Sequence, residues 1–353
     1  MKRRTLLALP LMAALPAARA QSDRPLRVLV GFPPGGSIDI VARVLAERMR
    51  EDLKQTVVVD NRAGAGGRLA AELLKAAPAD GSVMMITPVV VPVLAPMVFR
   101  KLNYDPATDF APVGHVCNFQ FALTVPAALP ARNVAELIAW LRANPQKANF
   151  GSPAAGSLPH FFGEMLSREA KADLVHVPFA GGAALMTALI GDQVAAGVDV
   201  VLESLEAHRA GKVRVLATSG DKRNPQLPEV PTFKEAGFAN MVASGWFGMY
   251  APAKTPEPAI AAVNRALNRA LAQPDVQDRF AKLALEPGGG TPADLVRLLP
   301  PGRAAVARAQ GRRLRALPLS RLQVRRAGRL RRDAWAGPHP ADGQGADLPG
   351  GRA

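Results

Sequence analysis

A turn rich in small residues, at 32–39 with the sequence FPPGGSID, has the composition of an anion-binding loop. It follows an apolar run at 26–31 and precedes apolar residues with helical spacing from Ile38 to Met49. A chain that leaves a strand at Pro-Gly-Gly and enters a helix at Ser37 has unpaired backbone N–H groups that converge beyond the strand end. Because these donors and the helix dipole both favour negative charge, we expect the turn to bind an anion.

Two later segments, 151–157 (GSPAAGS) and 178–182 (PFAGG), have similar chemistry. Glycine-rich turns of this kind offer backbone donors but few side-chain donors. Their repeated occurrence in one chain predicts a protein that binds small carboxylates.

Several polar residues near these turns also have a structural interpretation. Ser37 can cap the helix that follows, and Asp39 can interact with the helix dipole, while the loop still contacts a ligand. His160 either bonds to the backbone at a helix start or contacts a ligand, and the sequence leaves both roles open. His176 precedes Pro178 in a strand pattern and is interpreted as structural.

Strand and helix patterns alternate between about residues 21 and 300, a length that suffices for two domains. The predicted strands are 27–31, 56–60, 83–87, 119–125, 148–151, 174–176, 197–200 and 213–218. The predicted helices are 37–53, 68–76, 134–144, 159–170, 182–190, 202–210 and 256–271. Apolar strands that alternate with helices indicate parallel sheets covered on both faces and joined by right-handed crossovers. We therefore predict a doubly wound α/β architecture in which segments 119–125 and 242–247 cross between two lobes.

The first twenty residues have the features of a secretory signal peptide. Three basic residues at 2–4 precede an apolar stretch at 6–15, and the sequence Ala-Arg-Ala ends at Ala20. The apolar stretch is too short to span a membrane. We predict cleavage after Ala20 and a mature protein in the periplasm. Export by the Sec pathway is favoured, and twin-arginine export is the alternative because of the Arg-Arg pair.

The formal net charge of +15 is concentrated at the two ends of the chain. Residues 301–353 contain twelve Arg and three Asp, and residues 21–300 have a net charge of +2. A nearly neutral body gives no reason to expect nucleic acid as a partner. The tail from Pro300 has three interpretations, namely a basic arm for nucleic acid or membrane, a disordered extension, or the product of a reading-frame shift. We favour the frame shift because the composition changes abruptly within the helical pattern at 292–299.

Nine short sequence blocks follow one another along the chain between the signal peptide and about Leu299. They are 31–43 (GFPPGGSIDIVAR), 57–67 (VVVDNRAGAGG), 149–152 (NFGS), His160, 176–179 (HVPF), 191–194 (GDQV), 214–219 (RVLATS), 227–232 (LPEVPT) and 251–256 (APAKTP). Taken together, these blocks resemble the tripartite tricarboxylate transporter substrate-binding family, also called the Bug family of extracytoplasmic receptors.

The resemblance implies a two-lobed, periplasmic-binding-protein-like (Venus flytrap) α/β fold that closes around one small carboxylate. The lobes would comprise residues 21–122 with 246–299, and residues 123–245. Backbone amides and ordered water would make most of the contacts. The residues predicted to contact the ligand are Phe32, Pro34, Gly35, Gly36, Ser37, Asp39, Thr87, Ser152, Ala155, Gly156, Ser157, His160 and Asp199. The resemblance also implies a monomeric receptor without catalytic residues, cofactor or metal, with integral-membrane transporter subunits as partners.

Two details remain open under this resemblance. Asp199 matches a family position near the distal end of the ligand, where it either selects an amino group or is an ordinary capped or solvated carboxylate. The glycines within 64–67 either contact the ligand or form a turn that shapes lobe packing, and we favour the turn.

The sequence departs from the family pattern in ways that make the cleft more apolar. Residues 88–92 (PVVVP) replace small hydroxyl residues, and Leu158, Phe179 and Ala180 replace a usual Ser or Thr, Tyr and Lys. We therefore expect a less hydrophilic ligand, such as an aromatic or branched carboxylate.

Competing classes of function lack their motifs. There is no Gly-x-Ser-x-Gly for a serine hydrolase and no His-Glu-x-x-His for a zinc site. Leu69 stands where a dinucleotide-binding fingerprint beginning at Gly64 needs a third glycine, and Ser37 stands where a P-loop needs Lys. The single cysteine, Cys117, excludes an internal disulfide and is predicted to be a buried, inert thiol. The remaining alternative is a ligand sensor that docks on a signalling protein without serving transport.

Overall fold

The apolar run near the N-terminus forms strand β1 (Leu26–Val30), which is covered on both faces. Val28 packs in a buried cluster with helix α1 (Ser37–Leu53). The next residue, Leu29, packs in a second cluster with helix α2 (Arg68–Ala76). Successive side chains of a strand point to opposite faces, so an unbroken apolar run is what a sheet between two helix layers requires.

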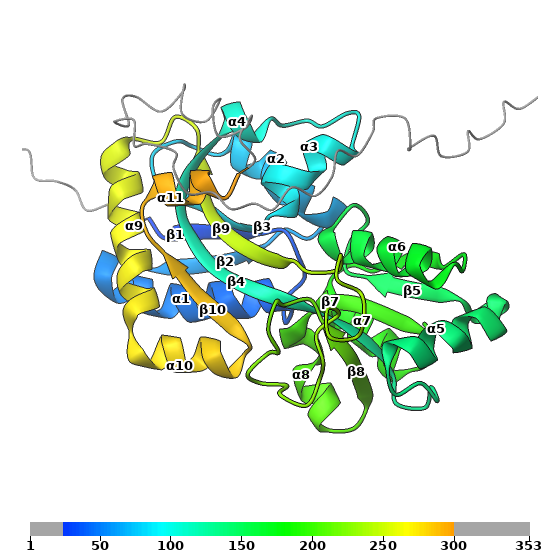
Figure 1. The fold of residues 1–353 in the computed structure, drawn as a ribbon. Coiled ribbons are helices and arrows are strands. Elements are labelled where there is room, and N and C mark those ends of the chain that lie inside the picture. The colour runs from blue at the N-terminus through cyan, green and yellow to red at the C-terminus, as the bar shows by residue number, and fades with distance from the viewer. Residues whose placement is uncertain (1–23, 300–353) are drawn as a thin grey trace, which may run out of the picture. The chain divides into compact units, whose positions relative to one another are not determined.

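A computed structural model describes residues 24–299, and the predicted signal peptide and tail lie outside these residues. The remaining strands are β2 (Val57–Asn61), β3 (Val83–Pro88), β4 (Phe110–Pro126), β5 (Asn149–Ser152), β6 (Val175–Pro178), β7 (Ala196–Val200), β8 (Val213–Thr218), β9 (Ser244–Pro252) and β10 (Leu285–Gly289). The remaining helices are α3 (Ala95–Val98), α4 (Pro106–Asp109), α5 (Val134–Ala143), α6 (Leu158–Ala170), α7 (Gly182–Ile190), α8 (Val201–Arg209), α9 (Glu257–Ala272), α10 (Pro274–Lys282) and α11 (Pro292–Arg297), with short helical turns η1 (Ala65–Gly67), η2 (Val90–Leu94) and η3 (Pro145–Lys147). Figure 1 shows their arrangement.

The strands form one ten-stranded sheet with the order β2-β1-β3-β9-β4-β7-β5-β6, and β10 and β8 also pair with β4. We call β2, β1, β3, β9, β10 and the N-terminal part of β4 the first half of the sheet. The second half comprises β6, β5, β7, β8 and the C-terminal part of β4. Each half contains three parallel strands, as the alternation of strands and helices predicts. The expectation of parallel pairing is wrong for β8, because β8 pairs antiparallel with β4 instead of joining the parallel strands.

Strand β4 runs through both halves and changes partners within three residues. Phe119 lies opposite Gly245 of β9, whereas Phe121 lies opposite Val200 of β7. Residues two apart in a strand point to the same face, and the two phenylalanine rings meet edge to face with centroids 5.5 Å apart. Gly245 leaves room for both rings, because a Cβ there would lie 2.2 Å from Phe119 and 2.8 Å from Phe121.

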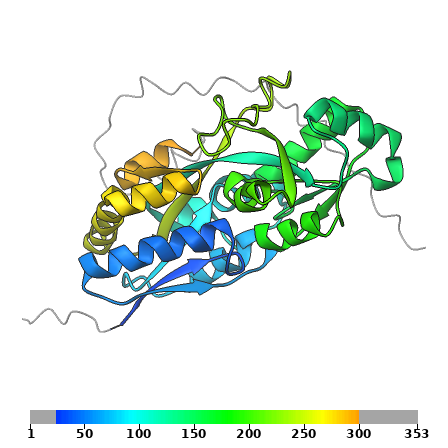
Figure 2. The ribbon, with the colours of Figure 1, turned by 90° about the horizontal axis from the view of Figure 1, so that it is seen from below.

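Helices cover both faces of the first half. Helices α1 and α9 lie side by side on one face, and α2 and α11 pack in the cluster on the other face (Figure 1, Figure 2). Arg48 of α1 also forms an ion pair of 2.7 Å with Asp275 of α10. Such exposed pairs contribute about 0–1 kcal/mol, so the buried side chains hold these helices on the sheet.

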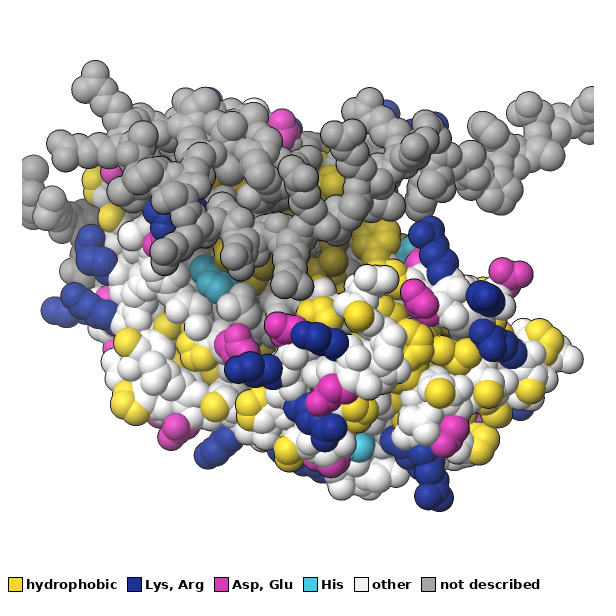
Figure 3. Space-filling view, viewed as in Figure 1, with side chains coloured by type: hydrophobic (Ala, Val, Ile, Leu, Met, Phe, Trp, Pro, Cys, Tyr) yellow, Lys and Arg dark blue, Asp and Glu magenta, His cyan; other side chains and the backbone are white. Residues whose placement is uncertain are grey.

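The surface carries charges of both signs. On the face shown in Figure 3, basic and acidic side chains are interspersed. Within residues 24–299, no helix combines the length and the apolar character that crossing a bilayer requires.

The sequence predicted α1, α2 and α7 with the bounds that the structure shows. Strand β4 is longer than the predicted 119–125, because Pro112 and Gly114 suggest a break in the pattern. The strand accommodates these residues at register shifts against β9. Strand β10 was missed for the same reason, since it contains a proline and two glycines. The lobe boundaries at 122–123 and 245–246 remain a prediction.

Gly245→Ala tests the packing at the partner change of β4. Replacing Gly with Ala in a strand normally stabilises by roughly 0.5–1 kcal/mol. Here the added methyl group would overlap the rings of Phe119 and Phe121, and overpacking costs about 1–3 kcal/mol. We expect a lower melting temperature for Gly245→Ala by calorimetry, and little change for Ser244→Ala at the exposed neighbouring position. A higher melting temperature for Gly245→Ala would contradict the packing described here.

Candidate functional site

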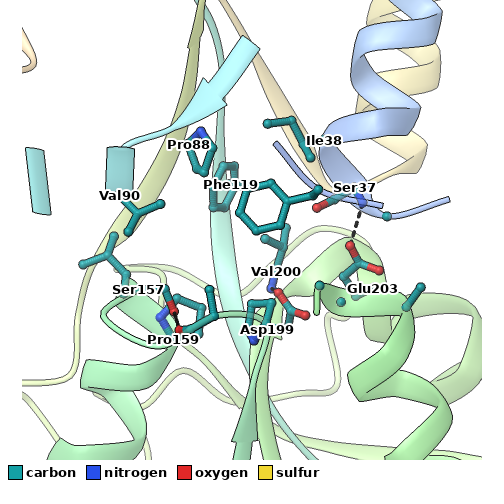
Figure 4. Close-up of a pocket in the computed structure, with 18 of the residues that line it drawn as sticks. Ser37, Ile38, Pro88, Val90, Phe119, Ser157, Pro159, Asp199, Val200 and Glu203 are labelled. Atoms are coloured by element: carbon teal, nitrogen blue, oxygen red, sulfur yellow. Dashed lines mark hydrogen bonds between the residues drawn. The ribbon is translucent and has the colours of Figure 1, made fainter. Parts of the chain in front are cut away.

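A cavity of about 250 Å³ lies where the two halves of the sheet meet (Figure 4). A chamber of this volume suits a small solute. The turn before α1, the end of β3, the middle of β4 and the N-termini of α6 and α7 all contribute to its wall. All three predicted glycine-rich turns therefore face the same cavity, with Gly36 and Ser37 from the first, Ala154 and Ser157 from the second, and Ala180, Gly181 and Gly182 from the third.

Most of the wall is apolar. The side chains of Phe32, Phe119, Phe121 and Phe247 line it, and Phe119 and Phe121 lie at the partner change of β4. Apolar walls of this kind bury the body of a ligand and leave its orientation to a few polar groups.

The departures from the family pattern largely fall on this wall. Residues 88–90, Leu158 and Ala180 line the cavity. Phe179 does not, because it packs against the cluster around Leu185 of α7. The prediction of an apolar cleft is thus supported at residues 88–90, at Leu158 and at Ala180.

Helix α1 begins without a side-chain cap. Its N-cap is Gly36, and Gly35 adopts a left-handed conformation (φ 87°) that makes the preceding turn. The backbone N–H of Ser37 donates to Glu203 Oε1 of α8 at 2.6 Å. A carboxylate from a distant part of the chain thus lies where the sequence predicts an anion.

Asp39 holds this turn in place. Its Oδ2 accepts hydrogen bonds of 2.9 Å from the N–H of Gly35 and from Arg43 Nε, and its Oδ1 accepts one from Asn61 Nδ2. Burial alone opposes ionisation, but the hydrogen bonds from Arg43, Gly35 and Asn61 outweigh it and lower the pKa of Asp39. Asp39 therefore acts on the cavity through the turn that it stabilises.

Helix α7 also begins without a side-chain cap, at Gly181 (φ 106°). The N–H of Gly181 donates to the carbonyl of Pro153 at 3.0 Å and ties the start of α7 to the turn before α6. Gly182, Ala183 and Ala184 follow and line the cavity. Among the described residues, no group accepts a hydrogen bond from their N–H groups. These three donors and the helix dipole make a second region of positive potential.

Helix α6 provides the third N-terminus at the cavity, and this one is capped. Ser157 Oγ accepts a hydrogen bond from the N–H of His160 at 3.3 Å and donates to the carbonyl of Ala154 at 2.7 Å. The Ser157 hydroxyl is thus already engaged within its own turn.

Two stacked histidines support the same turn. The rings of His160 and His176 lie 3.8 Å apart between centroids. His160 Nδ1 accepts a hydrogen bond from the N–H of Gly156 at 3.0 Å, and Ser152 Oγ lies 2.7 Å from His176 Nε2. Burial and then the neighbouring His160 lower the pKa of His176 to about 4, and burial also lowers that of His160. Of the two roles left open for His160, the structure shows the backbone hydrogen bond.

Two carboxylates lie at one end of the cavity, as Figure 4 shows. Asp199 near the end of β7 is 5% exposed, and its Oδ1 accepts a hydrogen bond of 2.7 Å from the N–H of Val200. Its Oδ2 is buried without a hydrogen-bond partner. Burial first, and then the charge of Glu203, raise the pKa of Asp199 well above its usual value, and burial also raises that of Glu203.

The predicted contact residues divide into two groups. Phe32, Gly36, Ser37, Ser157 and Asp199 line the cavity, whereas Pro34, Gly35, Asp39, Thr87, Ser152, Ala155, Gly156 and His160 do not line it. Contact of any of them with a ligand remains a prediction. Gly67 packs against the first turn, since a Cβ on it would lie 3.2 Å from Phe32. Gly66 packs against the second turn, since a Cβ on it would lie 3.2 Å from Ala154. These positions agree with the structural role favoured for the glycines within 64–67.

Sequence reasoning missed Glu203, Gly182 and the phenylalanines of β4. Glu203 follows Asp199 by four residues across a strand-to-helix junction, and this spacing was the available signal. Gly182 belongs to a turn that the sequence did single out, at 178–182, but its residues were not included among the predicted contacts.

No metal site is formed by the described part of the chain, where His, Cys, Asp and Glu side chains do not cluster in groups of three or more. Cys117 is buried in β4, and burial raises the pKa of its thiol. A buried thiol of raised pKa is inert, as the sequence predicts.

Asp199→Asn tests the raised pKa of Asp199. The unfolded chain releases this proton near the usual value of 3.8, whereas the folded chain holds it to higher pH. Wild-type stability should therefore fall relative to Asp199→Asn as the pH rises above 3.8. One pKa unit corresponds to about 1.4 kcal/mol, or a shift of about 2–4 °C in melting temperature. Melting curves from pH 4 to 8 check this, with Asp173→Asn at an exposed site as control. Parallel curves for wild type and Asp199→Asn would contradict it.

Comparison with known proteins identifies the family. The model of the tripartite tricarboxylate transporter family receptor matches residues 41–306. A UPF0065 protein from the tcbD-tcbE intergenic region of a Pseudomonas species is 34% identical over 307 residues, which cover 84% of this chain and 90% of that protein.

Solved structures agree with the sequence comparisons. The periplasmic binding protein BugD has 31% sequence identity and a TM-score of 0.76, with coverage of 82% of this chain and 98% of BugD. R. palustris Rpa4515, solved with adipate, has 32% identity and a TM-score of 0.76, with coverage of 81% and 94%. These matches confirm the two-lobed periplasmic-binding-protein fold and the family resemblance predicted from the motifs. The chain belongs to the tripartite tricarboxylate transporter receptor family, whose members are periplasmic solute-binding receptors.

Proposed function

We propose that this chain is a periplasmic receptor that binds one small carboxylate-bearing solute in the cavity and delivers it to a membrane transporter. Family membership and the adipate bound to the related Rpa4515 support a carboxylate as ligand. The signal-peptide pattern in the first twenty residues supports export. The transporter subunits and a monomeric state follow from the family and are part of the proposal.

The single observation that carries the proposal is the start of α7 at the cavity. Its first three N–H groups face an apolar chamber and have no acceptor among the described residues. A carboxylate at this position would accept hydrogen bonds worth roughly 1.5–3 kcal/mol each. Because micromolar affinity requires about −8 kcal/mol, two or three such bonds and burial of the solute body suffice.

Hinge closure is the mechanism that fits the sheet. Among the described strands, β4 and β9 are the longest and pair with each other up to the junction of the two halves, and the turns before α1 and α6 approach the cavity from different halves. A bound solute that contacts both turns would favour the closed arrangement by its difference in affinity for the two states.

The apolar wall narrows the class of solute. Four phenylalanines, Val90 and Leu158 line the chamber, so a hydrated dicarboxylate would lose water without regaining hydrogen bonds along most of its length. An aromatic or branched solute buries apolar surface there and gains about 25 cal/mol per Å².

Removal of one N–H donor tests this function. Ala183 is the second residue of α7 and is exposed, so proline fits there and deletes the N–H without breaking the helix. We expect Ala183→Pro to weaken carboxylate binding at least tenfold in calorimetric titration with 3-phenylpropionate, 4-methylpentanoate and adipate. The control Ala183→Ser keeps the donor and should bind within about twofold of wild type.

An uncharged analogue separates carboxylate recognition from simple burial. Wild type should bind 3-phenylpropanol much more weakly than 3-phenylpropionate. The proposed function fails if no carboxylate binds, or if the alcohol binds as tightly as the acid.

A further inference from the structure

Asp199 and Glu203 place two carboxylates against the cavity without a compensating cation. Neither forms an ion pair among the described residues, and no Lys, Arg or His lines the cavity. Asp199 Oδ2 is buried and makes no hydrogen bond. Buried carboxylates of this kind are costly unless a positive charge or a donor faces them.

The two carboxylates are close enough to bind one group together. A Cβ built on Gly182 would lie 2.6 Å from Asp199 Oδ2 and 2.6 Å from Glu203 Oε1, so these oxygens are no more than about 5 Å apart. Charge-assisted N–H···O bonds are about 2.7–2.9 Å long. A single nitrogen can therefore reach both oxygens.

Glu203 is held in this position from both sides. The N–H of Ser37 donates to its Oε1, and Gly182 provides the space that its carboxyl group occupies. In Figure 4, Glu203 extends from α8 to the first residue of α1, and the Asp199 carboxylate lies at the same end of the cavity. The oxygens therefore have fixed positions, which favours specific recognition.

We propose, building on the function above, that Asp199 and Glu203 form a subsite for a protonated amine, so that the solute is an apolar amino acid or a similar apolar zwitterion. The ammonium group binds between the two carboxylates, the solute carboxylate binds at the start of α7, and the apolar body packs on the phenylalanines. A dicarboxylate is disfavoured because its second negative charge would face the acidic pair.

Burial raises the pKa of both carboxyl groups, and the charge of Glu203 raises that of Asp199 further, which means that the pair holds a proton readily. An ammonium group supplies the same positive charge with more donors than a proton does. A proton in the empty protein, or an ammonium group in the bound one, therefore offsets the negative charge of the two buried carboxylates.

Matched solutes with and without an amino group test the inference. Phenylalanine and 3-phenylpropionate differ only in the amino group, as do leucine and 4-methylpentanoate. We expect the full chain, in calorimetric titration, to bind at least one amino acid at least tenfold tighter than its partner acid. In Asp199→Asn and in Glu203→Gln this preference should fall below about threefold.

Two features make the variants informative. Glu203→Gln keeps an oxygen that accepts the N–H of Ser37, so the contact between α8 and α1 is retained. Glu206→Gln, on the same helix but 84% exposed, is the matched control and should keep the full preference. Melting curves of each variant verify that it is folded.

The inference is overturned if neither amino acid binds, if both partner acids bind as tightly as the amino acids, or if the preference persists in both variants. If 3-phenylpropionate binds wild type as tightly as phenylalanine does, and Ala183→Pro weakens this binding, the amine subsite is refuted. The proposed carboxylate receptor then stands. Absence of binding by any carboxylate would refute both.

Discussion

The partner change in strand β4 is the constraint on which the rest of the structure depends. Because β4 is continuous, the two halves of the sheet meet at a fixed point, and Phe119 and Phe121 project there. Helices α1, α6 and α7 each follow a parallel strand of one half, so their N-termini lie at the carboxyl ends of those strands. In α/β sheets this edge is where ligands bind, and the cavity has formed at that edge of both halves.

The polar character of the cavity comes from the backbone and from the carboxyl groups of Asp199 and Glu203, because no basic side chain among residues 24–299 lines it. The uncapped starts of α1 and α7 provide N–H donors, while Asp199 and Glu203 provide acceptors. The surrounding phenylalanines lower the local dielectric constant, which strengthens favourable contacts and increases the cost of unpaired groups. One interaction already links the two sets, since Glu203 accepts the N–H of Ser37.

Local patterns predicted much of the fold. Helices α1, α2 and α7 have their predicted bounds because glycine turns and apolar spacing define them within a few residues. The start of β4 was missed because a strand that contains Pro112 and Gly114 forms only when a neighbouring strand accepts its register shifts. The direction of β8 was mispredicted because pairing depends on which strand lies beside it.

The candidate site likewise has parts that local sequence patterns predicted and parts that they did not. The sequence by itself determined the turns at 32–39 and 151–157, the helices that follow them and the apolar residues beside them, since each depends on interactions between near neighbours along the chain. Only the tertiary structure decided that Glu203 contacts Ser37, 166 residues away, and that Asp199 Oδ2 is buried without a partner. These contacts depend on the strand order and on the crossing of β4, which bring together residues whose local patterns carry no information about each other.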